Sequence, residues 1–111
     1  MEIQQVSDLP LYEQFRVVAE RWADSEAAAS LLEDTKSAVL AERMQSLLEE
    51  GMAVNRAEQT VKASQEWKDH IEVIIECRKV ANRDKVLMEY LRMKFQSWMS
   101  QEANSRTEAR L

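Results

Sequence analysis

The fold is decided by residues 52–111, which read MAVNRAEQTVKASQEWKDHIEVIIECRKVANRDKVLMEYLRMKFQSWMSQEANSRTEARL. The stretch contains neither Gly nor Pro, and an apolar repeat with alternating spacings of three and four residues runs through it. The positions of this seam are Thr60, Ala63, Trp67, His70, Ile74, Cys77, Ala81, Asp84, Met88, Leu91, Phe95 and Trp98. Such a pattern predicts one long helix over residues 52–109 that lies along other helices.

The composition fits a single helical domain over residues 1–111. Gly51 and Pro10 are the only Gly and Pro, which is too little turn chemistry for hairpins and sheets. Hydrophobic residues make up 45% and charged residues 32%, as expected of a folded helical protein rather than a disordered one. No apolar run is long enough to span a membrane, and the first residues lack a signal-peptide pattern. With one cysteine, Cys77, the chain is expected to be cytoplasmic and not membrane-bound.

The N-terminal half is expected to form a helical arm over residues 10–50, after a short segment 1–9. Ser7 or Asp8 is expected to cap this arm, with Pro10 in its first turn. Because Asp24-Ser25 is able to cap a new helix, the arm is expected either as one helix or as two helices nearly in line, broken near 24–25. The apolar stripe of the arm reads Leu11, Phe15, Val18, Trp22, Ala29 and Leu32.

Gly51 predicts the end of the arm, because glycine readily takes the left-handed conformation that ends a helix. Asn55 is expected to cap the next helix. A connection this short predicts that the two helices run antiparallel, and folding the chain about Gly51 puts Pro10 near Arg92. The predicted fold is therefore all-α, an elongated antiparallel helical hairpin or coiled-coil bundle with one very long C-terminal helix.

The long helix exceeds the length of the arm that would cover it. At 1.5 Å per residue it spans about 80–90 Å, against about 60 Å for the arm, so about 20–25 Å is left uncovered. The uncovered end is apolar, and a large exposed apolar patch usually marks an interface. The expected partner-binding surface comprises Tyr90, Met93, Phe95, Trp98 and Met99.

A second apolar face runs along the long helix, off the main seam. A helix with two apolar stripes lies between two neighbouring helices, and a two-helix hairpin supplies only one such neighbour. A homodimer covers both faces in the simplest symmetric way. The alternative is a monomeric three-helix bundle with a break near Asn82-Arg83-Asp84. The second face comprises Ile71, Ile75, Val86, Tyr90 and Met93.

The net charge of −5 is unevenly distributed: residues 1–50 carry 11 acids and 4 bases, whereas residues 51–111 carry 9 acids and 11 bases. One interpretation is pairing between an acidic and a basic helix, which sets orientation more than stability. The other is contact with nucleic acid, although the overall acidity disfavours strong nonspecific binding to phosphates. The residues available for that contact are Arg78, Lys79, Arg83, Lys85, Arg92 and Lys94.

Two polar residues, His70 and Asp84, occupy the main seam, where a polar side chain can fix the register of packing. Asp84 alternatively pairs with a nearby Arg or Lys. A metal site at His70 would need carboxylates or a second subunit, so no metal and no cofactor are expected. The sequence contains no phosphate-binding loop, HExxH or Gly-x-Ser-x-Gly motif. We therefore expect a non-enzymatic interaction protein without a small-molecule substrate.

The C-terminal half resembles the small helical accessory proteins of tailed bacteriophages. The resemblance covers about half of the chain and rests on helical residues, not on a chemical motif. It implies an accessory factor in the bacterial host cytoplasm, near recombination or host-takeover functions, and carries over no catalytic residues. The stretches concerned are Arg56-Ala57-Glu58, Glu66-Trp67-Lys68, Asn82 with Lys85-Val86, Glu89-Tyr90-Leu91-Arg92-Met93, and the ending from Glu102-Ala103 through Arg106 to Glu108-Ala109-Arg110-Leu111.

Overall fold

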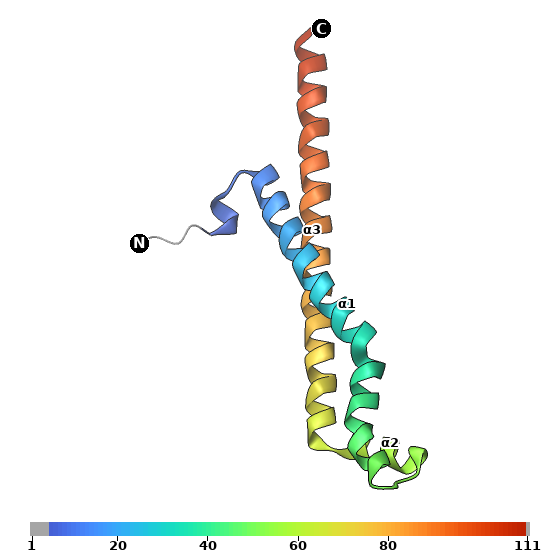
Figure 1. Cartoon of the computed structure of the whole chain (residues 1–111). Helices are drawn as coiled ribbons and strands as arrows, with labels where there is room; N and C mark the ends of the chain where they lie inside the picture. Colours follow the sequence, from blue (N-terminus) through green and yellow to red (C-terminus); the bar gives the residue numbers. More distant parts are fainter. Residues whose placement is uncertain (1–4, 111) are drawn as a thin grey trace. The chain divides into compact units, whose positions relative to one another are not determined.

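The computed structural model describes residues 5–110 (Figure 1). Within this range the chain forms a short 3-10 helix, η1 (Val6–Asp8), and three α-helices, α1 (Leu11–Glu49), α2 (Val54–Ala63) and α3 (Gln65–Arg110), with no strand. The all-α prediction is confirmed, as is a very long C-terminal helix, since α3 extends over 46 residues. Residues 1–4 of the predicted N-terminal segment 1–9 lie outside the described residues, as does Leu111.

Two compact units make up the chain. Unit 1 is Met1–Asp24 with Ala81–Leu111, and unit 2 is Ser25–Val80. In each unit a length of α1 packs antiparallel against a length of α3, which confirms the predicted antiparallel hairpin. Unit 2 additionally contains α2.

The start of α1 is set by Pro10 and not by a Ser or Asp cap. Leu9 is extended, with φ −82° and ψ 154°, because the residue before a proline is disfavoured in the helical region. The predicted caps Ser7 and Asp8 therefore fall in the separate turn η1, and that prediction was wrong. Instead, the side-chain amide of Gln14 donates a 2.7 Å hydrogen bond to the Leu9 carbonyl oxygen and ties the entering chain to the first turn.

The other end of α1 follows the prediction at Gly51. Gly51 has φ +93°, which glycine adopts without the steric cost that a side chain brings. Its N–H donates to the carbonyl of Leu48 at 3.0 Å, and the N–H of Met52 donates to that of Leu47 at 3.1 Å. This pair of bonds is a Schellman motif, which satisfies two carbonyl groups that the helix end leaves free. Between its ends α1 is continuous through Asp24 and Ser25, as one of the two expected forms of the arm.

The range 52–109 was predicted as one helix, and that prediction was wrong, because the helix is interrupted at Ser64. Ser64 is extended, with ψ 149°, and separates α2 from α3. Its hydroxyl accepts the backbone N–H of Trp67 at 3.2 Å, which is the hydrogen bond of an N-cap, and donates to the Val61 carbonyl at 2.6 Å. Glu66 adds an acid in the first turn of α3, where the helix dipole favours it.

The break rotates α2 relative to the predicted seam. Ala57 and Val61 are the buried residues of α2, whereas the expected seam residues Thr60 and Ala63 are exposed. The N-cap position of α2 is Ala53, so the prediction of Asn55 as cap was also wrong. Because α2 is a separate helix, it takes the orientation that buries its own apolar residues.

The core of unit 2 is a cluster around Trp67. Met44 of α1, Ala57 and Val61 of α2 and Trp67 of α3 are buried together, and Trp67 is 5% exposed. Figure 1 shows α2 where the chain reverses between the end of α1 and the start of α3. The cluster thus joins all three helices, and partly buried neighbours surround it: Val39, Leu40, Leu47, Met52 and Ile71.

In unit 1 the seam of α3 faces α1 as predicted, but in a shifted register. Val18 of α1 is fully buried, as is Ala81 of α3, and Leu91 is 4% exposed. Pro10 lines a groove with Phe95 and Trp98, and is therefore displaced from its predicted position near Arg92. The inserted helix α2 accounts for the shift, since the reversal of the chain takes more residues than a turn at Gly51 alone.

Trp67→Ala should destabilise the fold strongly. Removing a large buried side chain from a packed cluster costs about 3–5 kcal/mol, which should lower the melting temperature followed by circular dichroism at 222 nm. Trp98→Ala is the matched control, because Trp98 is 50% exposed and should shift the melting temperature far less. Equal losses for the two variants would contradict a core centred on Trp67.

Candidate interaction surface on α3

The face that α3 turns toward α1 in unit 1 contains a buried carboxylate, that of Asp84, which pairs with a half-exposed arginine. Asp84 is 7% exposed, and the Nε–H of Arg21 on α1 donates to its carboxylate oxygen Oδ1 at 3.0 Å. A buried carboxylate is stable only when it is paired and hydrogen-bonded, so this contact holds the Asp84 face of α3 toward α1. The expectation that a nearby base satisfies Asp84 is confirmed.

Away from that inner face, α3 carries an exposed apolar surface that we call the α3 strip. Its residues recur at helical spacing, so they form a band along one side of the helix. Val86 is 67% exposed, Tyr90 55% and Met93 61%, although side chains of this size usually lie inside a protein. The α3 strip comprises Val86, Leu87, Tyr90, Met93 and Trp98.

Two shallow grooves follow the α3 strip. The first is lined by Asn82, Arg83, Val86, Leu87 and Tyr90. The second is lined by Leu11, Tyr90, Met93, Lys94, Ser97, Trp98 and Gln101. Tyr90 lines both, so the two grooves adjoin at this residue. Arg83 and Lys94 are the charged residues that line them, and neither groove contains a carboxylate.

The start of α1 borders the C-terminal end of the α3 strip. Phe95 and Trp98 stack with ring centroids 5.9 Å apart and planes inclined by 27°. A third groove places these rings beside Pro10, Leu11 and Tyr12. The apolar end of α3 is therefore not an overhang, as the sequence suggested, because α1 reaches it. What continues beyond α1 is the exposed and mostly polar stretch from Met99 to Arg110.

The structure places the five predicted partner-binding residues in three settings. Tyr90, Met93 and Trp98 belong to the α3 strip, Phe95 is half-buried and stacks on Trp98, and Met99 is exposed but lines none of these grooves. Leu87 was missed by the sequence analysis. Leu87 lies three residues before Tyr90 and seven before Lys94, and this helical spacing would have indicated that it shares their side of the helix. The prediction considered only aromatic and methionine residues and therefore omitted it.

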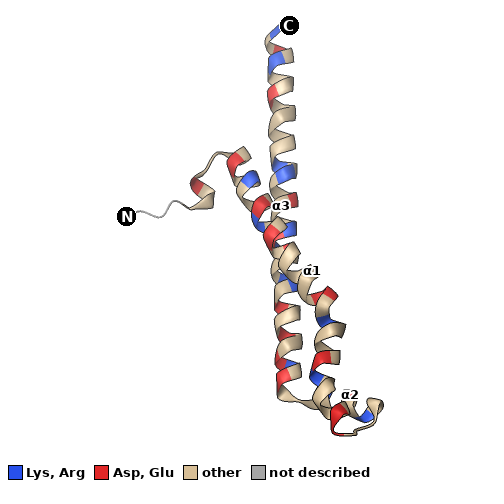
Figure 2. Ribbon diagram, viewed as in Figure 1, with Lys and Arg blue, Asp and Glu red and all other residues tan. Residues whose placement is uncertain are grey.

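The six predicted nucleic-acid residues differ in their local surroundings. Arg78 and Lys79 belong to unit 2, and the other four belong to unit 1. Lys79 forms a 3.3 Å ion pair with Glu76. Arg83 and Lys94 line the grooves of the α3 strip, whereas Lys85 and Arg92 line none of the grooves described here. In Figure 2 bases and acids are interspersed along the helices.

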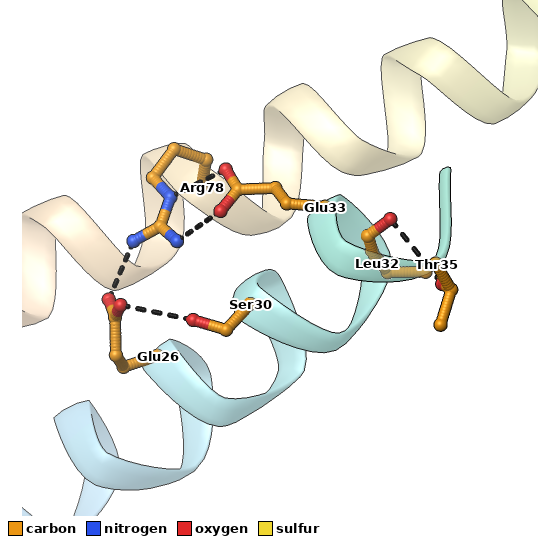
Figure 3. A network of polar contacts seen from close by, with 6 residues as sticks. All are labelled: Glu26, Ser30, Leu32, Glu33, Thr35 and Arg78. Carbon is orange, nitrogen blue, oxygen red and sulfur yellow. Dashed lines mark hydrogen bonds and ion pairs between the residues drawn. The ribbon is translucent and has the colours of Figure 1, made fainter. Parts of the chain in front are cut away.

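Arg78 is held by two carboxylates of α1 (Figure 3). Its Nη1–H donates to Glu26 at 2.6 Å, and its Nε–H and Nη2–H donate to the two oxygens of Glu33. Ser30 donates a further 3.2 Å hydrogen bond to Glu26. Hydrogen bonding to Glu33 and Glu26 raises the pKa of Arg78, and hydrogen bonding from Arg78 lowers the pKa of Glu33. Arg78 thus serves as an intramolecular clamp of unit 2.

The single histidine packs on the cluster of unit 2. The ring centroid of His70 lies 5.6 Å from that of Trp67, and the Nε2 atom of His70 is buried without a hydrogen-bond partner in the described part of the chain.

Residues 5–110 hold no group of three His, Cys, Asp or Glu side chains able to bind a metal ion together. Cys77 is a free, partly buried thiol. No helix among residues 5–110 combines the length and apolarity that crossing a membrane requires.

Comparison with protein-family models, with curated proteins and with solved structures finds no match for this chain. The features of the chain that bear on function are therefore the exposed surface of α3 and the charges beside it.

Glu33→Gln should destabilise the protein near neutral pH and have no effect in acid. Since the pKa of Glu33 is lowered by folding, the pair stabilises the folded state above the ordinary pKa of 4.5 and loses that contribution as the pH falls through the folded-state value. Melting temperatures measured from pH 7 downward should therefore converge. Glu72→Gln is the control, because Glu72 forms no ion pair with any residue from 5 to 110, and an equal loss at pH 7 would contradict the clamp.

Proposed function

We propose that this chain is a non-enzymatic helical interaction protein that binds another macromolecule through the α3 strip. The observation that carries the proposal is the exposure of Val86, Tyr90 and Met93 side by side on one helix. An exposed apolar band of this kind is typical of a surface that a partner covers. Two adjoining grooves along it suit a helix, since helix-in-groove recognition uses apolar side chains at intervals of three and four residues.

We further propose that the chain self-associates, with a homodimer as the simplest assembly. Of the predicted second apolar face, Ile71 is covered by the cluster of unit 2, while Ile75 is 48% exposed. Val73 and Val80, one heptad apart on α3, add exposed apolar side chains to unit 2. Pairing between copies removes this area from water, which supplies the driving force for association.

Light scattering over a concentration series tests self-association. The wild-type protein should reach a mass of twice the 12.9 kDa chain. The double variant Val73→Ser with Val80→Ser should shift the midpoint of the monomer–dimer transition to higher protein concentration, because the interface loses apolar area. The control pairs Val86→Ser with Tyr90→Ser, which should leave the midpoint in place. A mass of one chain at every concentration would remove the dimer from the proposal.

A second candidate function is nucleic-acid binding, and one observation favours it. Arg83, Lys85, Arg92 and Lys94 form no ion pair with any of residues 5–110, so their charges are available to phosphates. Tyr90 and Trp98 are exposed rings on which bases could stack. Single-stranded DNA is the probe for this candidate: it should bind the wild-type chain at low salt, and binding should weaken steeply as salt is added.

The setting that we propose for this function is that of a phage-encoded accessory factor in the bacterial cytoplasm. It rests on the resemblance of the C-terminal half to small helical proteins of tailed bacteriophages. A gene neighbourhood of phage genes would support this setting, and one of unrelated housekeeping genes would remove it. The interaction role itself does not depend on that outcome.

A further inference from the structure

The grooves of the α3 strip combine apolar walls with one sign of charge. Val86, Leu87 and Tyr90 supply apolar surface to the first groove, and its charged residue is Arg83. In the second groove the charged residue is Lys94. Neither cation forms an ion pair with the described residues, in contrast to Arg78 and Arg21, which both do. The strip thus has apolar side chains from Val86 to Met93 with one cation on either side of them in the sequence, and Trp98 lies beyond Lys94.

We propose that the partner covering the α3 strip is an acidic amphipathic helix of another protein. This inference rests on the proposed function and names the chemistry of the partner. The apolar face of such a helix would pack on Val86, Tyr90 and Met93, and its carboxylates would meet Arg83 and Lys94. Complementary charge at the rim of an apolar contact selects the partner and speeds its association.

The spacing of the two cations defines the partner further. Arg83 and Lys94 are eleven residues apart, which is about 16 Å along a helix. A helix lying nearly parallel or antiparallel to α3 would meet both with acids separated by the same interval. Between these acids it would present apolar residues at spacings of three and four to Leu87 and Tyr90. About three turns of partner helix therefore suffice.

The same charges disfavour a second copy at this surface. A two-fold contact centred on Tyr90 would bring two copies each of Arg83 and Lys94 together, and neither groove supplies a carboxylate to compensate them. Like charges held close at an interface oppose association. Nucleic acid fits less well, because Val86, Leu87 and Met93 offer aliphatic surface where phosphates and bases would need polar or aromatic contacts.

The probe is a fluorescently labelled peptide of about 20 residues with good helix formers, an apolar stripe and two Glu residues eleven positions apart. A second peptide carries Lys in place of both Glu residues, a third has the acidic sequence scrambled to remove the stripe, and a fourth probe is single-stranded DNA. Fluorescence anisotropy of each is measured against the full chain at about 50 mM and about 500 mM salt. The acidic striped peptide should bind at least about tenfold more tightly than the others at low salt and weaken at high salt.

Two double variants separate the α3 strip from the rest of the helix. Arg83→Glu with Lys94→Glu should weaken binding of the acidic peptide by about tenfold or more. Lys85→Glu with Arg92→Glu is the matched control, because it makes the same change of charge on the same helix and unit but outside the grooves, and it should stay within about twofold. Circular dichroism confirms that each variant is folded. Tyr90→Ala with Met93→Ala should also weaken binding by about tenfold.

Four results would overturn the acidic-helix assignment. Equal binding of the Glu and Lys peptides, lost in the Tyr90 and Met93 variant, leaves the proposed function standing and removes only the acidic partner. Preferential binding of DNA, lost in the Arg83 and Lys94 variant, makes nucleic acid the occupant. A fall in oligomeric mass in the Tyr90 and Met93 variant makes a second copy the occupant. Absence of binding to every probe, with unchanged mass in all variants, removes the α3 strip as an interaction surface altogether.

Discussion

Close packing of two helices along a narrow seam is the constraint on which the rest of this structure depends. Small residues occupy part of that seam: Ala29 in unit 2 and Ala81 in unit 1 are fully buried, and Val18 is the largest fully buried side chain among residues 5–110. Alanine lets two helix backbones approach closely but buries little apolar area. The two helices are therefore held by ion pairs beside the seam as well as by apolar contact. A seam of this width also leaves most of each helix surface exposed.

This constraint explains why α3 offers a surface to a partner. The ion pair between Arg21 and the buried Asp84 turns one face of α3 toward α1, and the helical periodicity places Val86, Tyr90 and Met93 away from that face. Because α1 covers a single face, Val86, Tyr90 and Met93 are left exposed. In unit 2, Ile71, which was predicted to belong to the same second apolar face, is partly buried against the cluster that includes α2. The difference between the two units thus follows from the position of α2.

Much of the fold could be predicted from spacing, and the departures came from local chemistry. The seam from Trp67 to Phe95 and the stop at Gly51 were readable because repetition and a lone glycine are strong signals. The break at Ser64 was missed because no Gly or Pro marks it, although a Ser followed by an acid two residues later is a known start signal. The pair Leu9-Pro10 indicates that η1 is separate from α1, because the residue before a proline is disfavoured in the helical region. The prediction instead took Ser7 or Asp8 as the cap of the arm.

The candidate site was predictable in part for the same reason. Large apolar residues on a long helix are easily recognised in a sequence, and Tyr90, Met93 and Trp98 were predicted on that basis. The role of Arg78 in pairing with α1 was not predicted. Its partners Glu33 and Glu26 lie 45 and 52 residues away, and their contact depends on a register that α2 shifts. A run of bases in the sequence therefore did not indicate which of them were free. Only the packing of α1 on α3 separates the clamp at Arg78 from the cations of the α3 strip.

The central claim is that α3 uses one face within the chain and keeps another face for a partner. Hydroxyl-radical footprinting by mass spectrometry tests it directly, with Met93 and Met99 as an internal pair of similar exposure, 61% and 53%, on different sides of the helix. In the chain alone both should oxidise readily while Leu91 is protected. With the acidic peptide bound, Met93 and Tyr90 should become protected and Met99 should not. Protection of Met93 in the free chain, or of Met99 by the peptide, would contradict the account.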